Sequence, residues 1–239
     1  MTWVRISVTR CARLCAALAV VAGATLGCAS TVEGVAVRDV DANPTNVQPL
    51  RESQLDDVML SIAQLNGIAG ATQMEVVLSG ERMSDNSDAV SDPDCLGSIF
   101  GAEDLVYRSS KWTAVRDQVA REPQDGNEHW AEQTAVLYPT EQLAADFVEK
   151  STSSWRGCGG FSVAVDDDTT SSIWRIDDVR VHGDVVTQRI SQEDSDGWEC
   201  QHAISAVANL SVETIACAFG INDEAISMVS AMIANAARL

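Results

Sequence analysis

Basic residues are scarce in this chain of 239 residues, in which 16 lysines and arginines stand against 35 aspartates and glutamates. The formal net charge is −19 at pH 7. Such an excess of negative charge repels phosphate backbones and anionic lipid headgroups at long range. The sequence therefore predicts no nucleic-acid partner and no electrostatic binding to a membrane surface. The acidity itself is typical of a soluble exported protein.

The familiar motifs of catalysis are also missing. The chain has no Gly-x-Ser-x-Gly elbow, no His-Glu-x-x-His helix, no Walker loop and no dinucleotide-binding glycine pattern. With three histidines and no matching ligand spacing, a zinc site is not expected. The acidic stretches 85–94 and 166–168 lack the EF-hand pattern and are interpreted as solvated loops. We expect a protein that is not an enzyme and has no metal or cofactor.

The apolar run near the N-terminus is too short to cross a membrane. It covers the 13 residues 14–26, follows three arginines and ends at Gly27. A basic start followed by a short apolar run is the plan of a secretory signal peptide, not of a transmembrane helix. We predict a leader over residues 1–27. Its removal leaves 13 basic against 35 acidic residues, a net charge of −22.

The leader ends in Ala-Thr-Leu-Gly before Cys28, which resembles a bacterial lipobox. Thr25 departs from the usual leucine at its position, and the alternative is simple secretion with an unpaired thiol at Cys28. We expect the lipidated form, in which a diacyl (palmitate-type) anchor on Cys28 holds the protein on the extracytoplasmic face of the cell membrane.

The rest of the chain divides into a tether and one domain. Residues 28–49 contain Pro44 and Pro49 and show no apolar periodicity, which predicts a flexible tether. The 190 residues 50–239 have the length of one domain.

Hydrophobic periodicity in this domain predicts an α+β fold, a twisted antiparallel sheet with flanking helices. The expected helices run from Ser53 to Leu65, from Pro139 to Lys150, and onward from a cap at residues 222–224. Alternating residues predict a hairpin of strands 112–119 and 128–138. They also predict a meander of strands 161–165, 173–181, 185–191, 198–207 and 211–219.

Four cysteines lie in the domain, and four cysteines allow three pairings. If strands 198–207 and 211–219 turn near Ala208-Asn209, Cys200 lies directly opposite Cys217, close to disulfide reach. Cys95 and Cys158 are then left for each other. Because no Cys-x-x-Cys motif is present, we expect two structural disulfides rather than a redox pair.

The aromatic residues suggest where a ligand would bind. Trp112 and Trp130 lie on the first expected hairpin, where such a pair suits a groove for an apolar or sugar-like ligand. Trp155 and Trp174 are interpreted as core residues. Glu128 and His129 precede Trp130 at an expected strand start, so solvent exposure is favoured there over an acid–base role.

A further set of motifs identifies a family. It comprises Asp92-Pro93-Asp94-Cys95, Val106-Tyr107, Trp155-Arg156-Gly157-Cys158, Trp174, and Cys200 and Cys217 around Asn209. With these residues and the final helix from Asn222, residues 50–239 resemble the PknH-like extracellular sensor domain family. Its members lie in the actinobacterial envelope, as the outer part of a receptor serine/threonine kinase or as free lipoproteins.

The resemblance implies a compact α+β domain with a twisted antiparallel sheet, two disulfides and an open cleft for an unidentified ligand. It implies no catalytic residues. The sequence shows neither a kinase domain nor a transmembrane helix, so we expect signalling to pass through another protein. The expected function is a membrane-tethered, non-enzymatic ligand-binding or sensor-like domain. The alternatives are an envelope protein that contacts other proteins through an exposed edge, and a hydrolase around Glu128 and His129.

Overall fold

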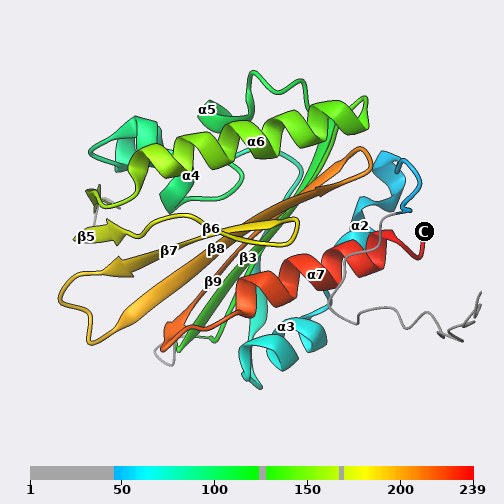
Figure 1. Cartoon of the computed structure of the whole chain (residues 1–239). Coiled ribbons are helices and arrows are strands. Elements are labelled where there is room, and N and C mark those ends of the chain that lie inside the picture. Colours follow the sequence, from blue (N-terminus) through cyan, green and yellow to red (C-terminus); the bar gives the residue numbers. More distant parts are fainter. Residues whose placement is uncertain (1–45, 124–127, 167–169) are drawn as a thin grey trace, which may run out of the picture. The chain divides into compact units, whose positions relative to one another are not determined.

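The computed structural model describes residues 46–123, 128–166 and 170–239, which form an antiparallel sheet between layers of helices (Figure 1). Within these residues nine strands pair in the order β1-β2-β3-β9-β8-β7-β5-β4, and β6 pairs with β7. The α+β fold is confirmed. The strands are β1 (Glu75–Gly80), β2 (Ala114–Arg121), β3 (His129–Leu137), β4 (Ser162–Asp166), β5 (Ser171–Ile176), β6 (Arg180–His182), β7 (Val185–Gln192), β8 (Trp198–Val207) and β9 (Leu210–Phe219).

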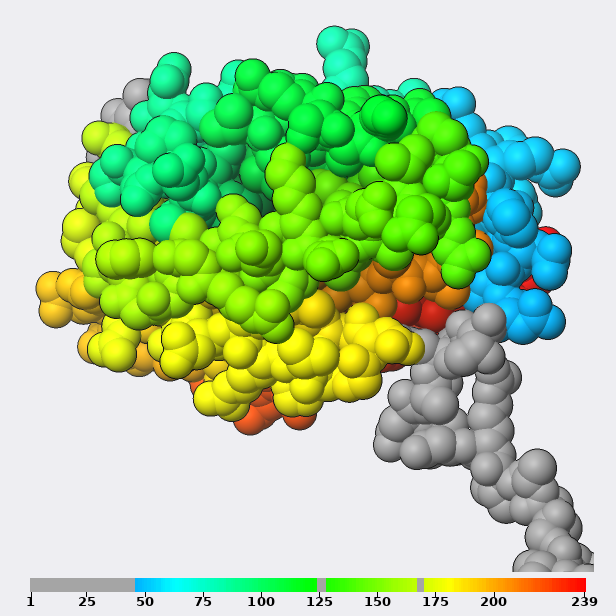
Figure 2. Space-filling view, turned by 45° about the horizontal axis from the view of Figure 1, so that its top comes forward, coloured from blue at the N-terminus to red at the C-terminus, as the bar shows by residue number. Residues whose placement is uncertain are grey.

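Helices cover both faces of the sheet, and the two longest, α6 and α7, lie on opposite faces (Figure 1). In Figure 2 the segment between β1 and β2, teal to green, and α6, yellow-green, form a continuous layer. The helices are η1 (Glu52–Gln54), α2 (Leu55–Val58), α3 (Ile62–Ala69), η2 (Ser87–Ala89), η3 (Pro93–Cys95), α4 (Leu96–Ile99), α5 (Asp104–Tyr107), α6 (Glu141–Cys158) and α7 (Glu224–Ala236).

Side chains alternate between the two faces along each strand. On β9, Leu210, Val212 and Ala216 join the apolar core under α7, together with residues of α2 and α3. The intervening residues Ile215 and Cys217 belong to a separate cluster on the other face. We call the two sides the α7 face and the α6 face.

The helix α6 sets the topology of the sheet. Its N-cap is Thr140, whose hydroxyl accepts a hydrogen bond from the Leu143 N–H at 3.3 Å. It carries the chain from β3, in the middle of the sheet, to β4 at one edge. The hairpin of β2 and β3 thereby pairs with the last strand, β9, from His129↔Ala218 to Leu137↔Leu210.

Both disulfides are confirmed. In the β8–β9 hairpin Cys200 lies directly opposite Cys217, and the bonded cysteines have Cα atoms 4.0 Å apart. The turn falls at Ala208 and Asn209, as the sequence predicts, because Val207 pairs with Leu210. Cys95 pairs with Cys158 across 63 residues of sequence and ties η3 to the end of α6.

The helix expected from Ser53 to Leu65 is wrong as a single element. The chain breaks at Met59, whose ψ of 147° is extended, and α3 starts afresh with Ser61 as its N-cap. The break follows from Gln133 of β3, whose side-chain oxygen accepts the Leu60 N–H at 2.7 Å and whose amide donates to the Leu60 carbonyl. This side chain replaces hydrogen bonds that a continuous helix would make.

Two further expectations need correction. The strand expected over 173–181 is divided into β5 and β6, because the pairing with β7 shifts by one residue between Ile176↔Ile190 and Arg180↔Thr187. The cap of α7 also differs: Asp223 at the N-cap makes no side-chain capping bond. Instead Gln201 of β8 accepts the N–H groups of the first turn, at 3.1 and 3.3 Å.

Candidate ligand pocket and the acidic cluster beside it

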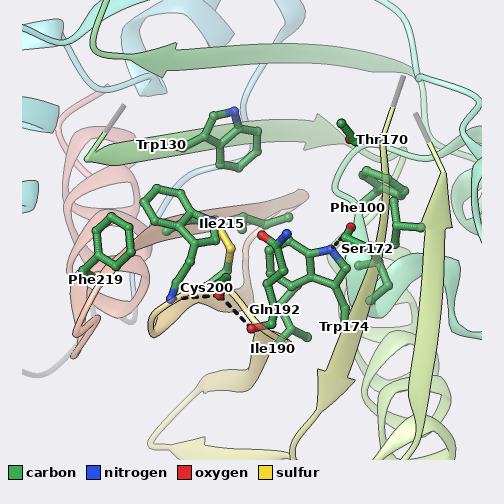
Figure 3. Close-up of a pocket in the computed structure, with 15 residues that line it drawn as sticks. Phe100, Trp130, Thr170, Ser172, Trp174, Ile190, Gln192, Cys200, Ile215 and Phe219 are labelled. Carbon is green, nitrogen blue, oxygen red and sulfur yellow. Dashed lines mark hydrogen bonds between the residues drawn. A yellow bond between two sulfur atoms is a disulfide. The ribbon is translucent and has the colours of Figure 1, made fainter. Parts of the chain in front are cut away.

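A pocket of about 630 Å³ opens on the α6 face, between the sheet and the segment that follows η3 (Figure 3). Five aromatic side chains line it, together with aliphatic residues and the Cys200–Cys217 disulfide. The polar lining consists of hydroxyl and amide side chains, and none of the described lining residues is charged. The aromatic lining residues are Phe100, Trp130, Trp174, Trp198 and Phe219, and the polar ones are Thr170, Ser172, Gln192 and Ser195.

The floor of the pocket is one row of directly opposed residues across four strands. Trp130 of β3 pairs with Cys217 of β9, Cys217 with Cys200 of β8, and Cys200 with Ile190 of β7. Because directly opposed residues point to the same face, the antiparallel register alone brings these side chains together.

Neighbouring contacts fix the rings at the rim. Trp198 and Phe219 are opposed at the open end of the β8–β9 hairpin and meet edge to face, with ring centroids 5.2 Å apart. The indole N–H of Trp174 donates to the Ser172 hydroxyl at 3.0 Å. Phe219 is 55% exposed, so an apolar ring is presented to solvent where a ligand would enter.

The Cys95–Cys158 disulfide holds the wall opposite the floor. Asp92 accepts the Asp94 N–H at 3.1 Å and starts η3, which leads through Cys95 into α4. The chain then passes Ile99 and Phe100, both of which line the pocket. The disulfide thus anchors this wall to α6.

Beside the pocket lies a buried group of polar side chains, which we call the acidic cluster: Glu103, Asp117, Glu132 and Glu213, with Tyr107 and His202. It separates two apolar clusters of the α6 face. On β8, for example, His202 lies between Cys200, which belongs to the pocket side, and Ile204, which packs with Tyr107 and Trp155.

Hydrogen bonds join the cluster around Glu213. Its carboxylate accepts from the Tyr107 hydroxyl at 2.5 Å and pairs with His202 Nε2 at 2.8 Å. His202 is fully buried, its ring lies against Trp155 with centroids 4.3 Å apart, and its Nδ1 has no partner within the described structure. A carboxylate oxygen accepts hydrogen bonds, so Nε2 of His202 is the donor in this pair.

The other carboxyls of the cluster are held in low dielectric. Burial, followed by the nearby carboxyls of Asp117, Glu213 and Glu103, raises the pKa of Glu132 well above 4.5. Burial also raises the pKa of Asp117, although hydrogen bonds from Thr134, at 2.8 Å, and from Glu132 oppose the change. The pKa of Glu103 is raised by burial in the same way, against hydrogen bonds donated by Asn86. Glu132 is therefore protonated, and donates to Asp117, over a wider pH range than an exposed glutamate.

The structure does not bring Trp112 and Trp130 together. In the β2–β3 hairpin Arg121 pairs with Trp130, whereas Ala114 pairs with Leu137, so Trp112 lies beyond the opposite end. Trp130 lines the pocket, and Trp112 packs against the other apolar cluster of the α6 face. A shared groove for these two tryptophans is therefore not formed.

Glu128 and His129 do not form a pair in the structure. His129 Nδ1 donates to Glu122 at 2.6 Å, and the His129 backbone N–H donates to the same carboxylate. Partial burial raises the pKa of Glu122, but these hydrogen bonds outweigh it and leave the pKa below its ordinary value. Glu128 is exposed, and neither residue is among the described residues that line the pocket.

Sequence reasoning missed most of the pocket. Trp155 is a core residue as predicted, 2% exposed. Trp174 is only partly buried: it packs against the apolar cluster that contains Cys200 and also lines the pocket. Trp198, Phe100 and Phe219 carried no expectation. The available signal was the alternation itself, which places Trp198 on the same face of β8 as Cys200. Cys28 lies outside the described residues.

Comparison with known proteins places this chain in a family. A family model described as the PknH-like extracellular domain matches residues 50–235. The chain belongs to this family. Its matched region is of an extracellular type, and within the described residues no helix is long and apolar enough to cross a membrane.

The relatives are serine/threonine-protein kinases. The serine/threonine-protein kinase PknH of Mycobacterium tuberculosis strain H37Rv is 32% identical over 191 residues, which are 80% of this chain and 30% of the kinase. PknH of Mycobacterium bovis is 33% identical over 178 residues, 74% of this chain and 30% of that kinase. This chain thus spans about 30% of the length of these relatives.

A solved structure also shows the similarity to PknH. The crystal structure of the extracellular domain of PknH from Mycobacterium tuberculosis matches with a TM-score of 0.77 and 31% identity. The match covers 81% of this chain and 100% of that domain. This chain therefore carries an extracellular sensor domain of the PknH type, and what it resembles is not a catalytic kinase domain.

Proposed function

We propose that the protein is a membrane-tethered, non-enzymatic sensor domain that binds an uncharged, largely apolar ligand in the pocket on the α6 face. The observation that carries the proposal is the lining: five aromatic rings and no charged side chain among the described residues. A pocket of about 630 Å³ is within the range that holds a small molecule or a segment of a lipid chain.

The charge of the ligand follows from the same lining. A charged group buried in this pocket would find no ion-pair partner among the described lining residues, and burying it would be costly. An anion would in addition meet the repulsion of a chain with net charge −19. Aromatic faces also attract cations, so the test must include one.

The pocket is tested with N-phenyl-1-naphthylamine, an uncharged aromatic dye whose fluorescence rises in apolar surroundings. The full chain with Cys28→Ser is used, so that no attached lipid competes. We expect saturable binding, and a loss of about tenfold in affinity in Trp174→Ala because a large buried contact is removed. Trp112→Ala is the matched control, since it removes a tryptophan outside the pocket, and should bind like the parent.

Charged competitors decide the ligand class. Tetramethylammonium and the anionic dye 1-anilinonaphthalene-8-sulfonate should compete poorly with the neutral dye. Strong competition by tetramethylammonium would replace the proposal with an aromatic cation site. Equal affinity of Trp174→Ala and the parent chain would remove the pocket as the binding site.

The tether is proposed from Cys28 and the residues around it. A lipid on Cys28 would keep the domain within reach of the membrane, so that an apolar ligand from the envelope is close at hand. Cys28→Ser should move the protein from the membrane fraction to the soluble fraction and abolish palmitate labelling. Cys15→Ser, in the leader, is the control and should stay in the membrane. Retention of Cys28→Ser in membranes would contradict the anchor.

A second function is favoured by one observation, the free edge of β1. Within the described residues β1 pairs only with β2, and Val76, Val77 and Leu78 are 42%, 46% and 50% exposed. Such an edge suits pairing with a strand of another protein, through which the domain would pass on its signal. Cross-linking in intact cells should lose its product in Leu78→Lys and keep it in Val181→Lys, a control at an exposed valine on β6. An unchanged product would remove this surface.

A further inference from the structure

The pocket and the acidic cluster are two ends of one surface. On each of three neighbouring strands, a residue that lines the pocket and a residue of the cluster lie two positions apart, and therefore on the same face. The pairs are Trp130 and Glu132 on β3, Ile215 and Glu213 on β9, and Cys200 and His202 on β8.

One wall of the pocket also contributes a residue to the acidic cluster. We call residues 99–103 the wall segment. Ile99 and Phe100 line the pocket, whereas Glu103 is part of the cluster. Between them, Gly101 lies directly on the Glu132 carboxyl: a Cβ on Gly101 would be 3.0 Å from Oε2. The wall segment therefore cannot stay in place if Glu132 changes position or acquires a shell of water.

The backbone of the wall segment is held by the cluster as well. The Ala102 N–H approaches Glu213 Oε2 at 3.4 Å, and Ala102 has a φ of 51°, in the left-handed region. The Glu103 carboxylate in turn accepts the backbone N–H of Asn86 at 2.9 Å. A residue in this strained conformation persists only where its surroundings hold it.

The charges that face Glu132 are of one kind. Asp117 lies on β2, Glu213 on β9 and Glu103 before α5, with Tyr107 and His202 behind Glu213. In the described structure no Lys or Arg forms an ion pair with any of the four carboxyls. The arginines there pair instead with Asp56, Glu81, Asp104 and Glu199. The described residues also contain no group of three or more ligating side chains suited to a metal ion. A proton on Glu132 would relieve the repulsion among these carboxyls.

We propose that the pocket is proton-linked: the protonated Glu132 holds the wall segment against the sheet, and release of its proton to solvent pushes that segment away and weakens ligand binding. The inference rests on the proposed pocket for its ligand, but its conformational part concerns the wall segment alone. Ionised Glu132 would face three other carboxyls in a region of low dielectric, where repulsion between like charges is strong. Water that entered the cluster would stabilise the new charge, and it can enter only if the wall segment moves away.

The direction of the effect follows from linkage. If the closed wall binds both the ligand and one extra proton, the affinity for ligand falls as the pH rises, by at most about tenfold per pH unit. In the full chain with Cys28→Ser, the dissociation constant of N-phenyl-1-naphthylamine should therefore increase between about pH 5 and pH 8. The dye is uncharged throughout this range.

Glu132→Gln is the decisive variant, because glutamine has the same shape, stays uncharged and can still donate to Asp117. It should bind the dye at pH 8 as tightly as the parent binds at pH 5, with little dependence on pH. Glu128→Gln removes an exposed glutamate from the start of the same strand region and should keep the pH dependence of the parent. If Glu132→Gln and the parent show the same pH dependence, the inference is overturned.

A second measurement needs no ligand. Amide hydrogen exchange of residues 96–107, corrected for the intrinsic pH dependence of exchange, should show loss of protection in the parent as the pH rises, and steady protection in Glu132→Gln. Unchanged protection in the parent contradicts the proposal even if the dye binds. If the dye fails to bind but the exchange behaves as expected, the proton-linked wall stands and only the proposed function fails.

Discussion

The two faces of the sheet use the same strands for different purposes. On β3 the residues that face α7 are Ala131, Gln133, Ala135 and Leu137. The three apolar ones join one continuous core, and Gln133 is buried among them. The residues of β3 that face α6 are Trp130 of the pocket, Glu132 of the acidic cluster, Thr134, which donates to Asp117, and Val136, which packs in the apolar cluster with Trp155. Alternation along a strand thus separates stability from binding with no additional element.

The two faces should differ in how well they tolerate substitutions. The α7 face is close-packed, so each side chain there has many neighbours and little tolerance. The α6 face leaves a pocket open and buries carboxyls that have no lysine or arginine partner among the described residues, and both features lower stability. Such departures from good packing are expected at functional sites.

The largest expected effect comes from the disulfide that holds the pocket wall. Replacing Cys95 and Cys158 with alanine frees a loop of 63 residues and should reduce the free energy of unfolding by about 4 kcal/mol, on the loop-entropy estimate. Urea denaturation measures the loss. The matched change at Cys200 and Cys217, which close a loop of 17 residues, should cost about 3 kcal/mol. A smaller loss for the Cys95 pair than for the Cys200 pair would contradict the estimate.

A core change on the α7 face should affect stability and leave the pocket intact. Met232 of α7 is fully buried in the apolar core. Met232→Ala should lower the free energy of unfolding by about 2 to 5 kcal/mol, by lost transfer energy and the cavity left behind. Leu239→Ala, at a half-exposed position, should cost much less. Folded Met232→Ala protein should bind the dye with unchanged affinity; a weaker pocket would show that the two faces are coupled.

Glu132→Gln should make the domain more stable at neutral pH. Because the folded-state pKa of Glu132 is raised, its contribution to stability is fully present below the ordinary value of 4.5 and is lost as the pH rises through the raised pKa. The difference between variant and parent should therefore be near zero at about pH 4.5 and grow with pH, by at most about 1.4 kcal/mol per unit. Urea denaturation over a pH series measures it. A difference that shrinks with pH would have the wrong sign.

The smallest effect on stability is expected at the rim of the pocket. Phe219 is 55% exposed, so Phe219→Ala should change the free energy of unfolding by no more than about 0.5 kcal/mol. It should nevertheless weaken binding of the neutral dye several-fold, since the ring covers the pocket entrance. Phe161→Ala is the control, at 58% exposure and outside the pocket lining, and fluorescence titration of both variants makes the comparison. Equal affinities would show that Phe219 takes no part in binding.

Local features of the sequence predicted much of the fold. The β8–β9 hairpin and its turn at Asn209 follow from alternation and turn residues close together in the chain, and they led to the correct cysteine pairing. Thr140 at the start and a regular apolar stripe predicted the helix α6. In contrast, β1 was not predicted, because its side chains are almost all exposed and show no apolar alternation.

By itself the sequence determined what residues close together in the chain decide: the hairpins, the Cys200–Cys217 disulfide, the starts of the long helices α6 and α7, and the acidic character of the chain. Tertiary structure decided the rest, because those features depend on partners far apart in sequence. Leu60 breaks a helix by bonding to Gln133, 73 residues away, and Glu213 approaches Ala102 across 111 residues. Trp130 lies beside Cys217 because β3 pairs with β9, and Trp112 is not its neighbour. The pocket and the acidic cluster exist through that register, which no local pattern encodes.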